Sequence, residues 1–290
     1  MSSSIKEKNM RTPVAGYNGM ARVIVPVLLL GAAVGFAYRG NTPGGNVLTD
    51  NLSEPLNGAT TAKVDINSGT GHLTIDGLTG SEQLLASGTL QYLENQAVPN
   101  RSVDTGNGQA TLTLRAGEGS GGRPWFRLPW AACGGGAYEW QIHLNPTVSS
   151  DITAHSDGGN IRLNLSGMAV ARVSADTGGG NMDVVLPDNA ANLSVAAKTG
   201  AGNVTVDVGN GITGSNTVDA SSGAGNVVVR IPSGIAARIH ATSGLGKVIV
   251  DSRFTNTDKN TYQSSDYDDA ANKVEITVNS GAGNVSVSTK

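Results

Sequence analysis

The chain has 290 residues, of which 40 are glycine, and charged residues make up only 15%. Its length predicts one long domain or two short ones. The net charge of −3 is too small for a charge-driven disordered chain, and of the wrong sign for a nucleic-acid binder. The single cysteine, Cys133, excludes an intramolecular disulfide framework.

An apolar segment near the N-terminus predicts export. Residues 23–38 carry no charge, and the preceding residues 1–22 are net basic. A retained transmembrane helix over 23–38 would leave 1–22 as a short cytoplasmic tail, with the rest of the chain outside the cytoplasm. The alternative is a cleaved signal peptide, since Gly35 and Ala37 offer small residues at the −3 and −1 positions, and the chain would then be secreted. Both interpretations place most of the chain outside the cytoplasm.

A repeated motif dominates the remaining sequence. The pattern [S/T]-G-x-G-N, followed by alternating apolar residues, recurs with substitutions of its last residue. Its spacing in the central copies is 21 to 23 residues, which is typical of a repeat architecture. The second glycine of the successive copies is Gly71, Gly108, Gly159, Gly180, Gly202, Gly225, Gly246 and Gly283.

The repeat predicts an all-β fold. Apolar residues alternate on both sides of each glycine turn, as in Val204, Val206 and Val208, and a period of two indicates half-buried strands. A two-strand unit cannot bury its apolar face alone, so we expect a β-helix-like solenoid with parallel strands between coils that follow one another in chain order. The expected organisation is a linker over 39–60 and a solenoid over 61–290, with an aromatic loop at 122–140 and an insertion at 252–272.

Two kinds of structural ladder are expected on the stacked coils. The asparagine that ends the motif would stack on its equivalents, because asparagine ladders stabilise parallel strands. The expected members are Asn160, Asn181, Asn203, Asn226 and Asn284. Opposite charges in equivalent outward positions also predict ion pairs between coils. These sets are Arg162 with Asp183, and Asp207 with Arg230 and Asp251.

One aromatic segment is the candidate binding site. All three tryptophans of the chain lie within sixteen residues, interleaved with arginines. One interpretation is a packed hairpin that caps the end or flank of the solenoid, since terminal coils need caps. The other is a patch that binds a glycan or a protein partner, because tryptophan and arginine are common anchors of interfaces. The binding candidates are Trp125, Arg127, Trp130, Tyr138 and Trp140.

No motif for catalysis, a cofactor or a metal is recognised. The glycine turns are not phosphate loops, because neither a Rossmann helix nor a Gly-Lys-[Ser/Thr] sequence follows them. The acidic stretch Asp266–Asp269 lacks an EF-hand or a nonapeptide calcium repeat. We therefore expect no catalytic residue, no metal and no cofactor, and no enzyme.

Three segments of the chain resemble toast-rack-type domains. These are EWQIHLNPTVSSDITAHSDGGNIRLNLSGM (139–168), SSDYDDAANKVEITVNSGAGNVSVS (264–288) and NLSEPLNGATTAKVDINSGTGHLTIDG (51–77). Such domains occur in the LiaF-like family, which is linked to the response to cell-wall-active antibiotics, and in adhesin-like relatives. The resemblance implies a β-helical extracytoplasmic domain without a known catalytic residue. The turns of this chain end in asparagine where those of the family often end in aspartate.

The expected function is a non-catalytic, membrane-anchored, extracytoplasmic interaction module that is adhesin-like or binds the cell envelope. Its partner would be an envelope glycan or an envelope protein, and not a nucleic acid. The alternative is a membrane-tethered sensor or regulator of envelope stress. Because a tail of 22 residues is too short for a signalling domain, such a sensor would act through a partner in the membrane.

Overall fold

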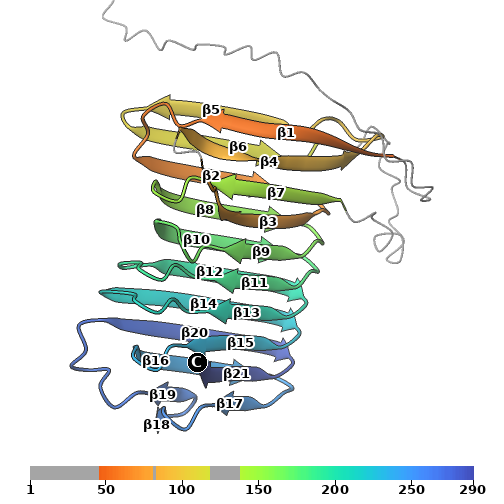
Figure 1. Ribbon diagram of the computed structural model, residues 1–290. Helices are drawn as coiled ribbons and strands as arrows, with labels where there is room; N and C mark the ends of the chain where they lie inside the picture. Colours follow the sequence, from red (N-terminus) through yellow and green to blue (C-terminus); the bar gives the residue numbers. More distant parts are fainter. Residues whose placement is uncertain (1–45, 81–82, 118–137) are drawn as a thin grey trace, which may run out of the picture. The chain divides into compact units, whose positions relative to one another are not determined.

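The computed structural model describes residues 46–80, 83–117 and 138–290, and these are all-β (Figure 1). They belong to a compact unit that extends from Val34 to Lys290. The part of the chain that the structure describes contains no helix able to cross a bilayer. The apolar segment 23–38 lies outside the described residues, so its prediction as a membrane anchor or signal remains a prediction.

The strands form two large sheets. Sheet A has ten strands, in the spatial order β1 (Val47–Pro55), β4 (Leu84–Leu93), β7 (Glu139–Leu144), β3 (His72–Gly77), β9 (Ile161–Asn164), β11 (Met182–Val185), β13 (Val204–Asp207), β15 (Val227–Ile231), β21 (Val285–Thr289) and β17 (Val248–Val250). Sheet B has eleven, in the order β18 (Thr255–Asp258), β19 (Thr261–Gln263), β16 (Ala236–Ser243), β20 (Lys273–Ala282), β14 (Ser215–Ala224), β12 (Ser194–Ala201), β10 (Val170–Thr177), β8 (Ser149–Ser156), β2 (Thr61–Asn67), β6 (Gln109–Arg115) and β5 (Asn100–Gly106).

One apolar core lies between the two sheets. Successive side chains of a strand point to opposite faces, so every second residue enters this core. Val204 and Val206 of β13 are completely buried, as are Val227 and Val229 of β15. Sheet B contributes small and branched residues in the same way, for example Ala197 of β12. The apolar residues that alternate in the sequence are therefore the residues that form the core.

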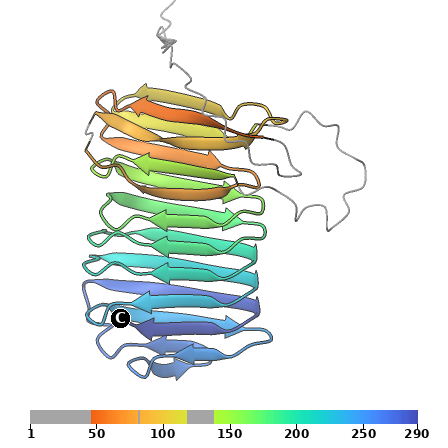
Figure 2. The ribbon, with the colours of Figure 1, turned by 45° about the vertical axis from the view of Figure 1, so that its right-hand side comes forward.

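The central coils stack as parallel strands. Each coil is one strand of sheet B followed by the next strand of sheet A, and equivalent residues of neighbouring coils are paired (Figure 2). Val195 of β12, for example, is aligned with Val173 of β10 and with Val218 of β14. The prediction of an all-β fold with parallel strands between coils is confirmed.

The coils do not follow chain order at either end, which corrects our expectation. The last coil, β20 and β21, lies between the coil of β14 and β15 and the coil of β16 and β17. At the other end, β2 and β3 lie between the coil of β8 and β9 and the coil of β6 and β7. The first and the last coil of the repeat region in chain order therefore each lie one position inside the end of the stack. In that position both strands of the coil are paired on both sides.

In the described part of the chain, strands outside the regular coils extend three of the four sheet ends. In the predicted insertion 252–272, β18 and β19 form an antiparallel hairpin that pairs with β16. Phe254 precedes this hairpin and is 4% exposed, packed against the core. At the other end, β1 pairs with β4, and β5 pairs with β6. Part of the segment 39–60, which we expected to be a linker, is therefore strand β1.

Candidate functional site

The [S/T]-G-x-G-N turns form a continuous column along one side of the solenoid. In the copies of the motif from Ser156 onward, the hydroxyl at the first position donates a hydrogen bond to a glycine carbonyl of the neighbouring coil. Thr177 binds the carbonyl oxygen of Gly159 at 2.8 Å, and Ser222 binds that of Gly202 at 2.7 Å. These side chains are buried, so their hydroxyls need partners inside the protein. The equivalent residues Ser156, Thr199, Ser243 and Ser280 make the same contact.

The glycines of the motif allow the coils to approach each other closely. A Cβ atom built on Gly180 would lie 2.1 Å from the carbonyl oxygen of Gly159. The same construction on Gly283 would place a Cβ 2.2 Å from the oxygen of Gly225. Real Cβ atoms do not come this near to a carbonyl oxygen, so no other residue fits at Gly180 or Gly283 without a shift of the backbone. This packing requirement was not predicted from the sequence, although the recurrence of the glycine in each copy of the motif indicates it.

The asparagines form a ladder of side chain to backbone hydrogen bonds. The Oδ1 atom of each asparagine accepts from the backbone N–H of the next, as between Asn181 and Asn203 at 2.9 Å. The five members are Asn160, Asn181, Asn203, Asn226 and Asn284. His72 takes the place of asparagine at one end, where its Nδ1 atom accepts from the Asn160 N–H at 2.9 Å. Lys247 is the last residue at the other end, and its N–H donates to Asn284.

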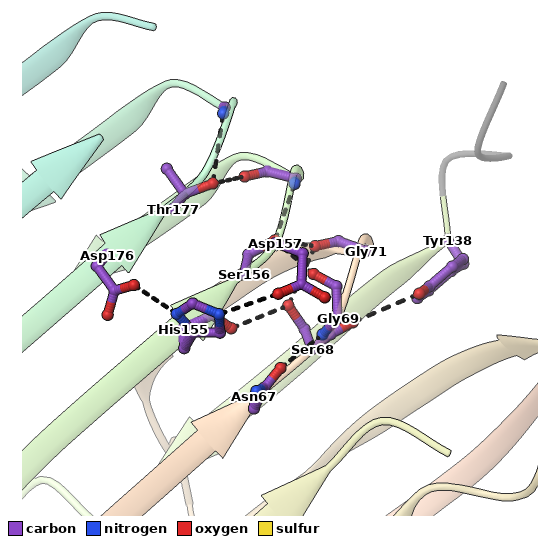
Figure 3. Close-up of polar contacts among 12 residues, drawn as sticks. Asn67, Ser68, Gly69, Gly71, Tyr138, His155, Ser156, Asp157, Asp176 and Thr177 are labelled. Atoms are coloured by element: carbon purple, nitrogen blue, oxygen red, sulfur yellow. Dashed lines mark hydrogen bonds and ion pairs between the residues drawn. The ribbon is translucent and has the colours of Figure 1, made fainter. Parts of the chain in front are cut away.

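A row of opposite charges runs beside this column on the outer face of sheet B. His155, Asp176 and Lys198 are aligned on adjacent parallel strands. The His155 ring bonds Asp176 through Nδ1 and Asp157 through Nε2, the latter at 3.1 Å (Figure 3). The Lys198 ammonium lies 3.2 Å from the carboxylate of Asp219 on the next strand. We call His155, Asp157, Asp176, Lys198 and Asp219 the charged row.

The charged row alters the titration of its histidine. Burial alone would lower the pKa of His155, but its hydrogen bonds to Asp157 and Asp176 act in the opposite direction. The negative charges of the same two carboxylates add to that effect, so the pKa of His155 is raised above its ordinary value. The ring therefore carries positive charge at a higher pH than a free histidine would.

Sheet A also carries ion pairs on its outer face. Arg230 lies 3.2 Å from Asp207, and Arg162 lies 4.0 Å from Asp183. The expectation that Asp251 continues the row beyond Arg230 is wrong. The inserted strand β21 places Ser288 next to Arg230, and the carboxylate of Asp251 binds the backbone N–H groups of Arg253 and Thr289 instead.

Two of the five aromatic-segment candidates lie in the core. Tyr138 is 2% exposed and Trp140 is completely buried. The Trp140 indole N–H donates to the carbonyl oxygen of Gln91 at 2.9 Å, and the Tyr138 hydroxyl bonds Thr70 at 3.1 Å. Because their surfaces are inaccessible, these two residues cannot contact a partner directly. Trp125, Arg127 and Trp130 lie outside the described residues, as does Cys133.

On the described surface, the polar side chains form rows between neighbouring coils and do not gather into a single site. Within residues 46–80, 83–117 and 138–290, no group of three or more histidine, cysteine, aspartate or glutamate side chains could hold a metal ion. In the acidic stretch 266–269, Asp268 pairs with Arg238 at 3.0 Å. What the geometry provides is a surface of stacked strands with hydrogen bonds and ion pairs between neighbouring coils.

Comparison with solved structures shows the same fold in another protein. A structure named a putative cell adhesion protein, from Clostridium sporogenes, is 23% identical and superimposes with a TM-score of 0.60. The match covers 83% of this chain and 99% of that one. A structure named a putative adhesin, from Bacteroides fragilis, covers 86% of this chain and 100% of that one, at 10% identity and a TM-score of 0.29. No curated protein sequence matches the chain.

Two family models match the sequence and overlap along the coils. The model described as the cell wall-active antibiotics response LiaF, C-terminal, matches residues 173–287. The model described as the N-terminal domain of toast_rack, DUF2154, matches residues 43–207, which is more than half of the chain. The sequence resemblance is thus confirmed, and the chain belongs to the toast-rack family.

Proposed function

We propose that the chain is a non-catalytic interaction module that binds material of the cell envelope from outside the cytoplasm. The apolar segment 23–38 would hold it at the membrane. Its partner would be an envelope glycan or an envelope protein. The observation that carries the proposal is the ladder construction of the outer faces, where side chains are repeated coil by coil.

This construction suits binding to an extended partner. Neighbouring strands of a sheet lie about 4.8 Å apart, so equivalent side chains recur at short and regular intervals. In the charged row, Asp176 and Lys198 present opposite charges on adjacent coils. A polymer or a protein with a complementary row could contact several coils at once, so many weak contacts would add up. The adhesion-related name of the Clostridium structure agrees with such a role.

The aromatic segment supplies a second candidate surface. Residues 118–137 lie in the sequence between β6 of sheet B and β7 of sheet A. Tyr138 and Trp140, which follow this segment in the sequence, are held by core packing and hydrogen bonds. We propose that Trp125, Arg127 and Trp130 make the direct contacts with the partner, since tryptophan and arginine are frequent anchors of interfaces.

Co-sedimentation of the full chain with isolated cell envelopes tests the proposal. We expect the chain to sediment with envelopes and the double variant Trp125→Ala/Trp130→Ala to remain in the supernatant. Lys198→Gln removes the lysine of the charged row and so tests the other candidate surface in the same assay. Thermal unfolding checks that each variant is folded. If the chain does not sediment with any envelope preparation, the proposal is wrong. If the tryptophan variant sediments normally, the site lies elsewhere.

A membrane-tethered sensor of envelope stress is the second candidate function. The match of residues 173–287 to the LiaF model favours it, because that model is described by the response to cell-wall-active antibiotics. The same experiment, repeated with envelopes stripped of protein, distinguishes a glycan partner from a protein partner. Binding that survives removal of protein from the envelopes indicates a glycan partner and an adhesin-like role. Binding that disappears with the protein indicates a protein partner, as a sensor requires.

A further inference from the structure

One edge of sheet A is uncovered at the end of the solenoid. The last strand, β17, pairs with β21 on one side, and within the described residues no strand pairs with its other side. Sheet B differs at the same end, because the hairpin of β18 and β19 pairs with β16. Proteins usually protect exposed strand edges, since such edges readily pair with another chain. The edge of β17 is therefore a candidate interface.

The backbone groups that face outward can be identified. The carbonyl of Lys247 accepts from the N–H of Val285, and the N–H of Asp251 donates to Val287, both at 2.9 Å. Both residues therefore bond toward β21. Hydrogen-bonding direction alternates along a strand, so the N–H and C=O groups of Val248 and Val250 point away from β21. The open edge thus offers two donors and two acceptors.

The side chains at this edge are unusually apolar for an exposed position. Ile249, in the centre of β17, is 57% exposed, and Leu245 in the preceding turn is 86% exposed. These are the two most exposed large hydrophobic side chains among the described residues. Charged residues flank the strand on both sides, with Lys247 before it and Asp251 after it. The edge combines an apolar centre with one positive and one negative end.

We propose that β17 pairs in antiparallel fashion with β17 of a second copy of this chain, with a two-fold axis at Ile249. In this register Val248 lies opposite Val250 of the second copy, and Lys247 lies opposite its Asp251. The two Ile249 side chains meet at the axis. The proposal goes beyond envelope binding and does not depend on it.

The edge is complementary to itself in three respects, which is why a second copy is the occupant. The outward groups of Val248 and Val250 satisfy each other completely in an antiparallel pair. Each copy contributes one cation and one anion, so the pair forms two symmetric ion pairs. The two Ile249 residues form a non-hydrogen-bonded pair, in which side chains lie closest together. An unrelated strand would need all three features by chance.

The two charged groups are available for this contact. Within the described part of the chain, no carboxylate lies within ion-pairing distance of Lys247. The N–H groups of Arg253, at 2.9 Å, and Thr289, at 3.3 Å, orient the Asp251 carboxylate. These hydrogen bonds lower the pKa of Asp251, so it carries its charge throughout the neutral range. An oriented anion at one end and a free cation at the other fit the proposed register.

The edge lies at one end of sheet A and is small. β17 and β1 are the two opposite ends of sheet A, and the N-terminal segment leads into β1. A three-residue strand forms a small and weak interface, and several copies acting together would strengthen it through avidity.

Disulfide trapping of the full chain tests the proposed register. In a Cys133→Ser background, Ile249→Cys would place two thiols on the axis, where the Cα atoms of a non-hydrogen-bonded pair lie about 4.5 Å apart, within reach of a disulfide. Ser286→Cys is the matched control, because Ser286 lies next to Ile249 one strand further in. We expect a covalent dimer from Ile249→Cys under mild oxidation, and little from Ser286→Cys. Equal yields from the two variants, or no dimer from either, would overturn the proposal.

A charge variant tests the ion pairs without altering the apolar centre. In the Ile249→Cys chain, Lys247→Glu places a glutamate opposite Asp251 at both ends of the paired strands. We expect this repulsion to lower the rate of cross-linking about tenfold, whereas Lys247→Arg should preserve the rate. An unchanged rate in Lys247→Glu would contradict the register. Head-to-tail association is tested with Val47→Cys on β1 in combination with Ile249→Cys. Cross-links between positions 47 and 249, without any between two copies of 249, would also overturn the proposal.

Discussion

The side chain of Asn160 accepts a hydrogen bond from the backbone N–H of Asn181 at 2.8 Å, one coil further along the solenoid. Asn181 repeats this arrangement toward Asn203 at 2.9 Å. Each asparagine thus supplies an acceptor to the next coil at the point where its sheet A strand begins. The ladder therefore helps to hold successive coils in register.

The first prediction concerns the acceptor oxygen of this ladder. Asn203→Ala leaves the N–H of Asn226 without its partner, and we expect the free energy of unfolding to fall by about 0.5–1.5 kcal/mol. Asn203→Asp keeps an oxygen in the same place and should cost less. Urea denaturation of the full chain measures both changes. If alanine and aspartate are equally destabilising, the hydrogen bond accepted by the Asn203 Oδ1 atom does not stabilise the stack.

The second prediction concerns the contact between glycine turns. A Cβ on Gly180 would lie 2.1 Å from the Gly159 carbonyl oxygen, whereas a Cβ on Gly179 would meet nothing within 4 Å. We expect Gly180→Ala to destabilise the protein by at least about 1–3 kcal/mol, since the backbone of two coils must move apart. Gly179→Ala, in the adjacent position, should leave stability within about 0.5 kcal/mol of wild type. Similar midpoints for the two variants in thermal unfolding would refute the explanation.

The third prediction concerns the buried hydroxyl row. The Thr177 hydroxyl donates to the Gly159 oxygen at 2.8 Å and accepts from the N–H of Gly180 at 3.3 Å. Thr177→Val has nearly the same shape but leaves both backbone groups unpaired, and we expect a loss of about 1–3 kcal/mol. Thr177→Ser keeps the hydroxyl and serves as the control. Chemical denaturation should therefore rank serine well above valine, and the reverse order would exclude this hydrogen-bonding role.

The sequence predicted the local construction well, because it is repeated in every coil. The two-residue period located the strands, and the recurrent asparagine indicated the ladder between Asn160 and Asn284. The order of the coils could not be predicted, since the motif copies around Gly246 and Gly283 are nearly interchangeable. One cue was present in Lys247, which replaces asparagine. The last coil of a ladder needs no side-chain acceptor for a further coil, and Lys247 lies in that last coil.

The aromatic segment shows the limit of composition as a guide to a binding site. Tyr138 and Trp140 are close in sequence to Trp130, but they continue the alternation of Ile142 and Leu144 in β7. That period of two places them among the inward residues of a strand, and both are buried. The clustering of aromatic residues in a sequence does not by itself distinguish buried core residues from surface residues. Periodicity could have made this distinction for Tyr138 and Trp140.

The fourth prediction concerns the ion pair on sheet A. Arg230 faces Asp207 on one side and the neutral Ser288 on the other. Arg230→Ala should cost only about 0.2–1 kcal/mol, as is usual for exposed pairs. Arg230→Asp should cost more, because it places two carboxylates side by side. Unfolding at low and high salt provides the check, since salt screens repulsion between exposed charges. Equal losses for the two variants would show that the pair does not stabilise the stack.

The last prediction concerns the pH dependence contributed by His155. The pKa of His155 is raised in the folded chain by its hydrogen bonds to Asp157 and Asp176, against the opposing effect of burial. A raised pKa means that the folded state binds the proton more tightly than the unfolded state does. The contribution to stability is therefore fully present below the unfolded pKa of about 6.5, and it is lost as the pH rises through the folded pKa.

We therefore expect His155→Gln to lower the melting temperature more at about pH 5.5 than at about pH 8.5, on either side of the ordinary histidine pKa. The other three histidines are present in both chains, so their titration cancels in the difference. Asp176→Asn is the matched control, because it removes one of the two carboxylates that raise the pKa of His155 while leaving the ring in place. In that background the effect of His155→Gln should depend less on pH. A loss that is the same at both pH values would mean that proton binding at His155 is not linked to folding.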